Sequence, residues 1–216
     1  MMERILAFGD IHGCYNKLIR LMKQLKINPE KDVLVFLGDY IDRGDQSKEV
    51  VDYLIDLKKQ LTSTVFLLGN HEQMLLDYLN GGNINPFLVN GGKKTLNSYF
   101  GENWLFSEAD LKVDFPREHL EFFYSLSPYY ELEDYIFVHA GLRDGVPIER
   151  QELLDLLWIR EDFYFSKFEF GKTIIFGHTP FQQPFIYKQK IGIDTGATYG
   201  NKLTCVELPA RKFFTV

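Results

Sequence analysis

Five short motifs, each combining glycine with metal-binding residue types, constrain the fold of this chain more than any other feature. In order they are GDIHG at 9–13, GDYIDRG at 38–44, GNHE at 69–72, HAG at 139–141 and GHT at 177–179. Each motif directly follows or ends an apolar run, and four of the five histidines of the chain lie inside the motifs. Ligands placed at strand ends can converge on one point, so the motifs predict separate strands that end at one shared site.

The first third of the sequence is typical of alternating strands and helices. Apolar runs at 5–8, 33–37 and 64–68 each lead into a glycine and predict buried strands. Helical spacing of apolar residues follows the first run, and Ser47 is a plausible N-cap for a helix after the second. This alternation predicts an α/β fold in which parallel strands are joined by right-handed crossovers.

The remaining sequence divides into two parts. Residues from about Glu72 to Tyr130 are mixed and rich in aromatic residues, and we expect a helical cap inserted over the active face. The last third returns to strand-like runs, whose spacing and turns suggest a largely antiparallel second sheet. No linker is visible, so we expect a single domain over residues 1–216 with the cap-like insertion at about 72–130.

Composition excludes some partners. A formal net charge of −6 argues against a broad electrostatic grip on nucleic acid, and no segment approaches the length of a membrane span. The N-terminus, MMER, runs straight into a strand-like segment and lacks the apolar stretch of a signal peptide. The two cysteines, Cys14 and Cys205, form no CxxC pair, which favours a reduced, cytoplasmic setting. The oligomeric state is left open.

The early motifs supply ligands for a first metal ion. Asp10 and His12 are two residues apart, so in extended backbone both face the same side and can reach one ion beyond the first strand. Asp39 follows the neighbouring strand in the same manner. Because a carboxylate has two oxygens, Asp39 could bridge two ions. One such motif alone would be an ordinary turn, whereas five in order favour metal binding.

The later motifs supply ligands for a second ion. Asn70 offers a neutral carbonyl oxygen after the third strand, and His139 and His178 follow later strands. A set of carboxylate, imidazole and amide ligands suits two divalent metals. Two ions that share a bridging carboxylate are a recurrent device for the hydrolysis of phosphate esters. The predicted cofactor is therefore a pair of divalent ions, and the predicted substrate is a phosphoprotein or a small phosphoester.

His71 is the expected catalytic histidine. It adjoins Asn70 but need not bind metal, and as an imidazolium it could protonate the leaving group as a general acid. Asp42 could hold the other ring N–H and keep the ring cationic. Arg43, which follows Asp42, is expected to clamp two phosphate oxygens, because a planar guanidinium donates to both at once. Asn70 and Arg160 are further candidates for phosphate binding, although Arg160 could equally be a surface residue.

These residues resemble the calcineurin-like metallophosphoesterases, and within them the phosphoprotein phosphatase branch. The pattern GDxHG, GDxxDRG, GNHE, HAG and GHT of this branch is matched in full between Gly9 and Thr179. The GDYIDRG segment is the most specific part, because other metallophosphoesterases usually lack its Asp-Arg-Gly ending. The resemblance covers nearly the whole chain.

The resemblance implies a four-layer α/β/β/α sandwich and attack on phosphorus by a hydroxide that bridges two metals, with no covalent phosphoenzyme. It implies manganese as the usual ion, with iron and zinc in relatives. The implied ligands of one ion are Asp10, His12 and Asp39, and those of the other are Asp39, Asn70, His139 and His178. It further suggests that Asp194 and Thr195, in the segment from Ile193 to Ala197, shape a turn behind the metals.

The chain departs from eukaryotic protein phosphatases at several positions. It has Leu68 before GNHE where they have arginine, and Trp158-Ile159-Arg160 where they have Trp-Ser-Asp. These features look like bacterial and phage phosphatases and the symmetrical diadenosine tetraphosphate hydrolases. The first expectation is therefore a phosphomonoesterase acting on phosphoserine or phosphothreonine in proteins. The alternative is a dinucleoside polyphosphate hydrolase, and a non-catalytic metal-binding module is a third.

Overall fold

The computed structural model describes residues 4–102 and 115–216, whose strands form two five-stranded sheets. The strand order is β10-β9-β1-β2-β3 in the first sheet and β4-β5-β6-β8-β7 in the second. The strands are β1 (Arg4–Phe8), β2 (Asp32–Phe36), β3 (Thr64–Phe66), β4 (Tyr129–Glu131), β5 (Tyr135–Val138), β6 (Thr173–Phe176), β7 (Phe185–Tyr187), β8 (Lys190–Gly192), β9 (Thr204–Leu208) and β10 (Lys212–Thr215).

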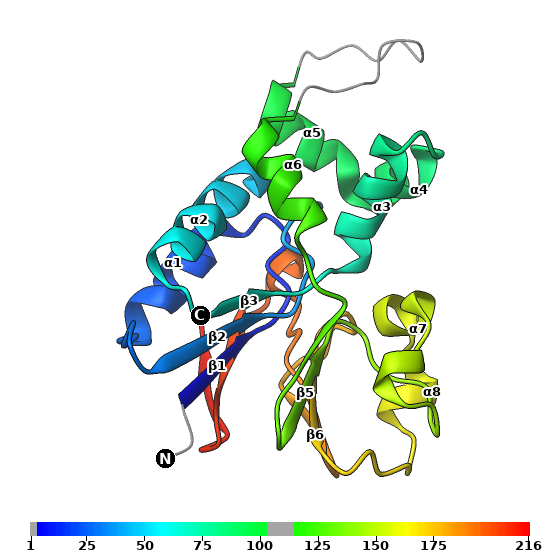
Figure 1. Ribbon diagram of the computed structural model, residues 1–216. Helices are drawn as coiled ribbons and strands as arrows, with labels where there is room; N and C mark the ends of the chain where they lie inside the picture. The colour runs from blue at the N-terminus through cyan, green and yellow to red at the C-terminus, as the bar shows by residue number, and fades with distance from the viewer. Residues whose placement is uncertain (1–3, 103–114) are drawn as a thin grey trace.

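Helices cover the two sheets on their outer faces, which confirms the four-layer α/β/β/α arrangement. Figure 1 shows α1 and α2 against the first sheet and α7 and α8 against the second. The helices are α1 (Tyr15–Gln24), α2 (Ser47–Gln60), α3 (Asn70–Leu79), α4 (Asn85–Phe87), the π-helical η1 (Leu88–Gly92), α5 (Lys93–Phe100), α6 (Arg117–Tyr124), the 3-10 helix η2 (Ile148–Arg150), α7 (Leu153–Trp158), α8 (Glu161–Tyr164) and the 3-10 helix η3 (Ala197–Tyr199).

Alternation along the buried strands produces these layers. In β1, Ile5 and Ala7 belong to the core between the sheets, while Leu6 and Phe8 belong to the core under α1 and α2. In β5, Phe137 likewise faces the core between the sheets and its neighbours face α7 and α8. Successive side chains of a strand point to opposite faces, so a strand that is apolar throughout needs a partner layer on both sides.

The second sheet corrects one expectation from the sequence. It is mixed rather than largely antiparallel, because β5, β6 and β8 pair in parallel and only the edge strands β4 and β7 are antiparallel. The last two strands, β9 and β10, join the first sheet instead. Parallel neighbours need a long crossover, and the segment with α7 and α8 between β5 and β6 supplies it.

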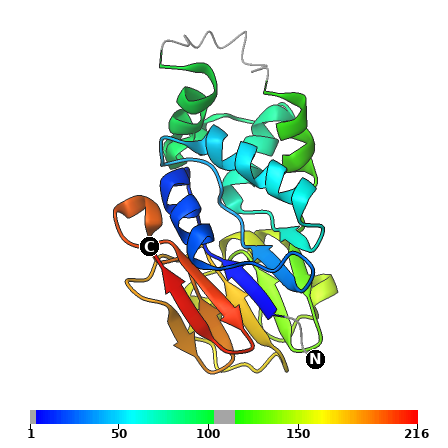
Figure 2. The same ribbon diagram turned by 90° about the vertical axis from the view of Figure 1, so that its left-hand side faces the viewer.

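Two helices of the segment from Glu72 to Tyr130 lie beside α2. Within the described part of this segment, α5 and α6 pack against α2, and Figure 2 shows the green helices above the sheets next to it. Ser47 is the first residue of α2 rather than its N-cap, which is Gln46, so the predicted cap was wrong. Part of the expected cap, residues 103–114, and the N-terminal residues 1–3 lie outside the described residues.

Among residues 4–102 and 115–216, no helix is both long and apolar enough to cross a bilayer. Both cysteines are free thiols, so no disulfide links Cys14 to Cys205.

Parallel pairing brings the motifs together. In the first sheet β1, β2 and β3 run in parallel, and in the second sheet β5 and β6 do so. The carboxyl ends of parallel neighbours meet at the same edge of a sheet. The motifs that begin at Gly9, Gly38, Gly69, His139 and Gly177 all lie just beyond these ends.

The stacked rings of Phe8, Phe36 and Phe66 are central to the core under α1 and α2. Phe36 lies 4.3 Å from the ring of Phe8 and 5.1 Å from that of Phe66, between centroids. We predict that Phe36→Ala lowers the free energy of unfolding by about 3–5 kcal/mol, because it leaves a cavity in close-packed surroundings. Urea titration measures this change. The matched control is Phe165→Ala, at a residue that is 62% exposed, and an equal loss in both variants would contradict the prediction.

Candidate metal centre

Strand ends deliver the candidate ligands to one place. Asp10 lies two residues beyond β1 and Asp39 three beyond β2, while His139 follows β5 directly and His178 lies two beyond β6. Asn70 and His71 open helix α3. All the predicted ligands and catalytic residues at these positions are buried: Asp10, His12, Asp39, Asp42, Asn70, His71, His139 and His178. The structure thus brings together residues that span most of the chain.

Asp39 is the centre of the arrangement. Its Oδ2 lies 3.3 Å from His12 Nε2 and its Oδ1 lies 3.4 Å from His139 Nε2. Among the described residues, Asp39 belongs to two groups of potential metal ligands, one with His12 and His71 and one with His139 and His178. Within each group the ligand atoms lie within 4.8 Å of one another. A carboxylate shared by two ligand groups has the geometry that the bridging role requires.

The amide oxygen of Asn70 joins the second group. Asn70 Oδ1 lies 3.0 Å from His139 Nε2 and 3.0 Å from His178 Nδ1. The other ring nitrogen of His139 contacts the Leu37 carbonyl oxygen at 2.8 Å, which assigns its proton to Nδ1 and leaves Nε2 without a proton, as metal binding would require. His12 is oriented in the same way, by a 2.8 Å contact from Nδ1 to the Ile41 carbonyl oxygen.

Asp10 has a different environment from the one expected. Its carboxylate lies in neither ligand group and accepts the backbone N–H of His178, at 3.0 Å to Oδ2 and 3.2 Å to Oδ1. Burial and the negative charges of Asp194 and Asp39 raise the pKa of Asp10 well above its usual range. A carboxylate in this position favours a nearby cation, so ligation by Asp10 stays a prediction.

The electrostatics fit divalent cations. Burial opposes ionisation of Asp39, but the imidazoles of His139, His71 and His12 outweigh it and hold the pKa of Asp39 well below its usual range. Burial and the neighbouring His139 lower the pKa of His178 to about 2, so its ring is neutral, as a metal ligand must be. Among the described residues, the buried Nε2 atoms of His71 and His178 have no hydrogen-bond partner. The unpartnered nitrogen of His178 suits bound metal, and that of His71 is left available for contact with a ligand.

His71 and Asp42 form the expected pair. His71 Nδ1 lies 2.6 Å from Asp42 Oδ2, and both side chains are fully buried. Burial lowers the pKa of His71 to about 3 and raises the pKa of Asp42 well above its usual range. Both pKa shifts oppose the permanently protonated, cationic His71 ring that we expected. The contact is better described as a histidine–carboxyl pair that shares one proton.

Two hydroxyls hold Asp42 in place: that of Ser47, which the sequence suggested only as a helix cap, and that of Thr95, which had no predicted role. The Thr95 hydroxyl donates to Asp42 Oδ1 at 2.5 Å, and the Asp42 backbone N–H donates to Thr95 Oγ1 at 2.8 Å and Ser47 Oγ at 3.1 Å. Thr95 is buried and lies in α5, within the inserted segment. A single sequence carried no local signal for this contact, because the two residues are 53 positions apart.

The backbone is strained where the side chains converge. Five non-glycine residues of the site have positive φ: His12 (44°), Asp39 (53°), Asp42 (70°), Arg43 (66°) and His178 (62°). This left-handed region costs on the order of 1–3 kcal/mol per residue and persists only where the surroundings enforce it. Clustering of strained residues at one point is typical of functional sites.

Glu72 enforces part of this geometry and was missed as a functional residue. Its buried carboxylate accepts the backbone N–H groups of Tyr40 at 2.8 Å, Asp39 at 2.9 Å, and Ile41 and Gly69 at 3.2 Å. One side chain thus ties the turn of the bridging carboxylate to the turn that begins α3. Its position as the last residue of the GNHE motif could have indicated a functional role for Glu72.

The two predicted arginines lie beside the ligands. Arg43 Nη1 is 2.7 Å from His12 Nε2. Arg160 Nη1 is 3.5 Å from the hydroxyl of Thr179, the residue after His178. Guanidinium groups therefore border both ligand groups, a placement that suits a phosphate held between them.

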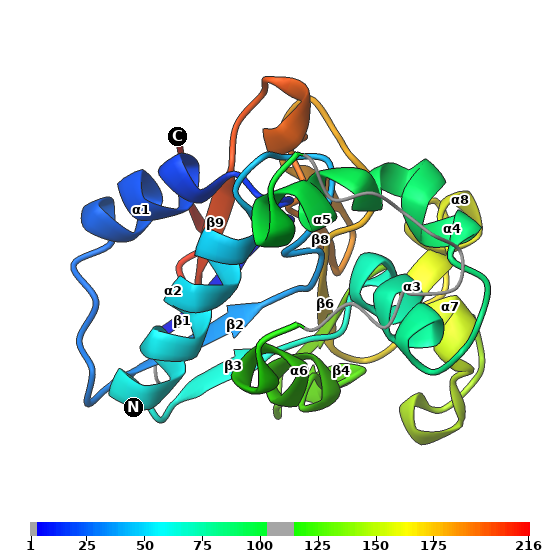
Figure 3. The same ribbon diagram turned by 90° about the horizontal axis from the view of Figure 1, so that it is seen from above.

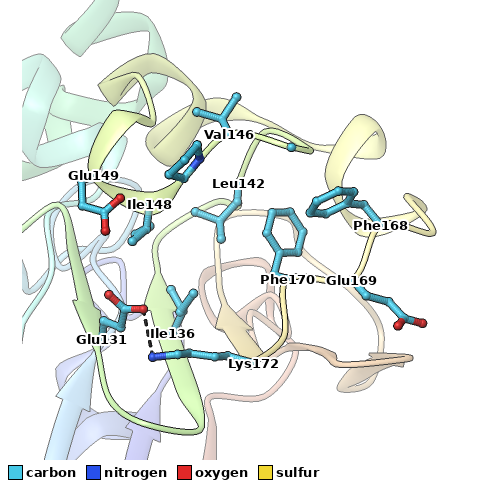
Figure 4. A pocket seen from close by; sticks show the side chains of 12 residues that line it. Glu131, Ile136, Leu142, Val146, Ile148, Glu149, Phe168, Glu169, Phe170 and Lys172 are labelled. Carbon is cyan, nitrogen blue, oxygen red and sulfur yellow. Dashed lines mark ion pairs between the residues drawn. The ribbon is translucent and has the colours of Figure 1, made fainter.

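A separate pocket of about 360 Å³ lies elsewhere, on the second sheet (Figure 4). Ile136, Leu142 and Phe170 line it, together with an ion pair of 3.0 Å between Lys172 Nζ and Glu131 Oε1. None of the predicted site residues lines this pocket, so we do not associate it with the metal centre.

Comparison with known proteins agrees with the geometry. The family model for the calcineurin-like phosphoesterases matches residues 3–206. The asymmetrical bis(5'-nucleosyl)-tetraphosphatase PrpE of Bacillus velezensis is 29% identical over 234 residues, covering 96% of this chain and 90% of the relative. The protein of the same name from a Geobacillus species is 28% identical, covering 95% and 91%.

Solved structures give the same fold. A protein provisionally named as a diadenosine tetraphosphatase has a TM-score of 0.76 at 22% identity, covering 99% of this chain and 93% of that one. A serine/threonine phosphatase of Saccharomyces cerevisiae has a TM-score of 0.65 at 17% identity, covering 99% and 79%. At these identities the likeness establishes the fold alone.

The shared position of Asp39 makes a specific prediction about metal content. We expect Asp39→Asn to weaken binding at both sites by more than about tenfold, because one charge that both ions need is removed. Titration with Mn²⁺ followed by metal analysis of the protein measures this loss. Asp56→Asn, at an exposed carboxylate with the same chemistry, is the control. Retention of two tightly bound ions by Asp39→Asn would show that Asp39 does not bridge.

Proposed function

This chain belongs to the calcineurin-like phosphoesterase family of hydrolases, and we propose that it hydrolyses dinucleoside polyphosphates. The observation that carries the proposal is the pair of buried ligand groups that share Asp39, bordered by the guanidinium groups of Arg43 and Arg160. This arrangement suits a substrate with several adjacent phosphates, because positive charge extends to both sides of the reacting centre.

The choice of substrate differs from the first expectation from the sequence. That expectation was a serine/threonine protein phosphatase, with a dinucleoside polyphosphate hydrolase as the alternative. Curated relatives that align with nearly the whole chain bear the name bis(5'-nucleosyl)-tetraphosphatase, which favours the alternative. The protein phosphatase among the solved structures is only 17% identical and supports the fold alone. The retained ligand set and the family membership favour catalysis over a non-catalytic binding module.

Bound divalent ions would lower the pKa of a water molecule and neutralise phosphate charge. The residues that would hold them are Asp39, Asn70, His12, His139 and His178, with Asp10 nearby. The identity of the ions stays a prediction, manganese first and iron or zinc as alternatives. Free thiols at both cysteines agree with the expected cytoplasmic setting, which also remains a proposal.

The side chains of the chain would complete the reaction. Arg43 and Arg160 would orient the phosphate and stabilise charge on its non-bridging oxygens. Water adds to phosphorus, one bridging P–O bond breaks, and a proton goes to the departing oxygen. The unpartnered His71 Nε2 is placed to deliver that proton, while the proton shared with Asp42 moves onto Nδ1.

The test of the proposed function is a comparison of kcat/KM on diadenosine tetraphosphate and on a phosphoserine peptide, both with Mn²⁺. We expect a clear preference for the dinucleotide. A preference for the peptide would overturn the proposal and favour the first expectation, a serine/threonine protein phosphatase. Product analysis then distinguishes AMP plus ATP, the asymmetrical outcome in the relatives' name, from two molecules of ADP, the symmetrical outcome expected from the sequence.

A second prediction concerns the acid role of His71. His71→Asn should lower kcat by roughly 10² to 10⁴ on a phosphoserine or alkyl phosphate substrate, because the alkoxide leaving group needs a proton. The loss should be smaller on p-nitrophenyl phosphate and on diadenosine tetraphosphate, whose leaving groups are stable as anions. Steady-state kinetics on the three substrates measures the pattern. Equal losses on all three would argue against proton donation by His71.

A further inference from the structure

We propose that two aromatic residues, Trp158 and Tyr199, each paired with an arginine at the metal centre, bind the two bases of the substrate. The inference rests on the proposed function and extends it to the residues that select a dinucleotide. It concerns two surfaces, one at the end of α7 and one in η3. Neither aromatic residue was assigned a role from the sequence.

The first surface is a pocket of about 560 Å³, a volume typical of small-molecule sites. Its lining includes Trp158 and Arg160 together with Arg143, Leu154 and Asp162. The ring of Trp158 lies 5.8 Å from that of His178, between centroids, so one residue of the pocket lining contacts a residue of the second ligand group. Trp158 is nevertheless 38% exposed, which leaves indole surface for a ligand.

The second surface is built around Tyr199. The guanidinium carbon of Arg43 lies 5.6 Å from the centroid of the Tyr199 ring, and the same guanidinium reaches His12. Tyr199 is 63% exposed, although its loop is held in place by Lys17, whose ammonium donates to the carbonyl oxygens of Ala197 and Asn201. A large aromatic ring on a fixed loop beside a phosphate-binding arginine is suited to stacking.

The two surfaces lie on different sides of the strand ends. Figure 3 shows η3, in orange, and α7, in yellow, apart from each other around the ends of β6 and β8. Each therefore repeats one arrangement: a guanidinium beside a ligand histidine and an exposed aromatic ring next to it. A dinucleoside polyphosphate has the matching order, with a base at each end and phosphates between. Stacking on an aromatic ring tolerates any base. The structure therefore assigns the class of ligand and leaves the identity of its two bases open.

The test uses Trp158→Ala and Tyr199→Ala in the full chain with Mn²⁺, and Phe165→Ala as a control at an exposed aromatic residue. For each protein kcat/KM on diadenosine tetraphosphate is divided by kcat/KM on p-nitrophenyl phosphate, which has no base. We expect this ratio to fall about tenfold in each aromatic variant, equivalent to about 1.4 kcal/mol of lost stacking, and to stay constant in the control. Trp158→Phe should retain most of the ratio.

A second measurement separates base binding from catalysis. We expect Ki for ADP, relative to Ki for inorganic phosphate, to rise in at least one aromatic variant, with p-nitrophenyl phosphate as the reporter substrate. If the wild type fails to hydrolyse diadenosine tetraphosphate, the proposed function is wrong, and the inhibitor ratio still decides the base sites. The base sites would be overturned if the ratio of Ki values were unchanged in both aromatic variants. They would also be overturned if kcat/KM fell equally on diadenosine tetraphosphate and p-nitrophenyl phosphate, and Trp158 would then only support His178.

Discussion

Negative charge buried at the meeting point of the strands is the constraint on which this structure depends. Asp10, Asp39 and Asp194 are each at most 5% exposed, and the repulsion among them contributes to the raised pKa of Asp10. An uncompensated buried carboxylate is strongly unfavourable, and burial lowers the pKa of His139 and His178, so these two rings carry no compensating charge. Divalent ions between the carboxylates and the rings would satisfy both groups at once. The stability of the fold and the chemistry of the site would therefore both require bound divalent ions.

The local backbone is fitted to that requirement. Left-handed conformations at His12, Asp39 and His178 turn each side chain inward just after its strand or turn, and such conformations need external support. At Asp39 this support comes from Glu72, which accepts four backbone N–H groups from two different turns. The core beneath is ordinary by comparison, since alternating apolar residues in β1 and β5 already define which layer each side chain enters.

The sequence predicted the layers and the convergence of motifs because both arise from local patterns. Apolar runs ending in glycine identify strands and the turns after them, and motif spacing places Asp39 and His139 at strand ends. Sheet pairing was predicted less well, since antiparallel and parallel neighbours have similar local composition and β5 finds β6 only through a distant crossover. Thr95 was not predicted because its partner, Asp42, is remote in sequence. Trp158 and Tyr199 were not predicted because their exposure depends on the folded surface.

The contact between Thr95 and Asp42 has a consequence for how this scaffold can diversify. The inserted helices carry Thr95 in α5, so a structural element apart from the sheets reaches the pair formed by His71 and Asp42. A change in the inserted helices would have to keep a hydroxyl at position 95 to preserve this contact. Lineages that exchanged or shortened the helices would have to replace the hydroxyl from another direction. A shared evolutionary pressure would thus link the outer helices to a reaction whose metal ligands all lie outside α5.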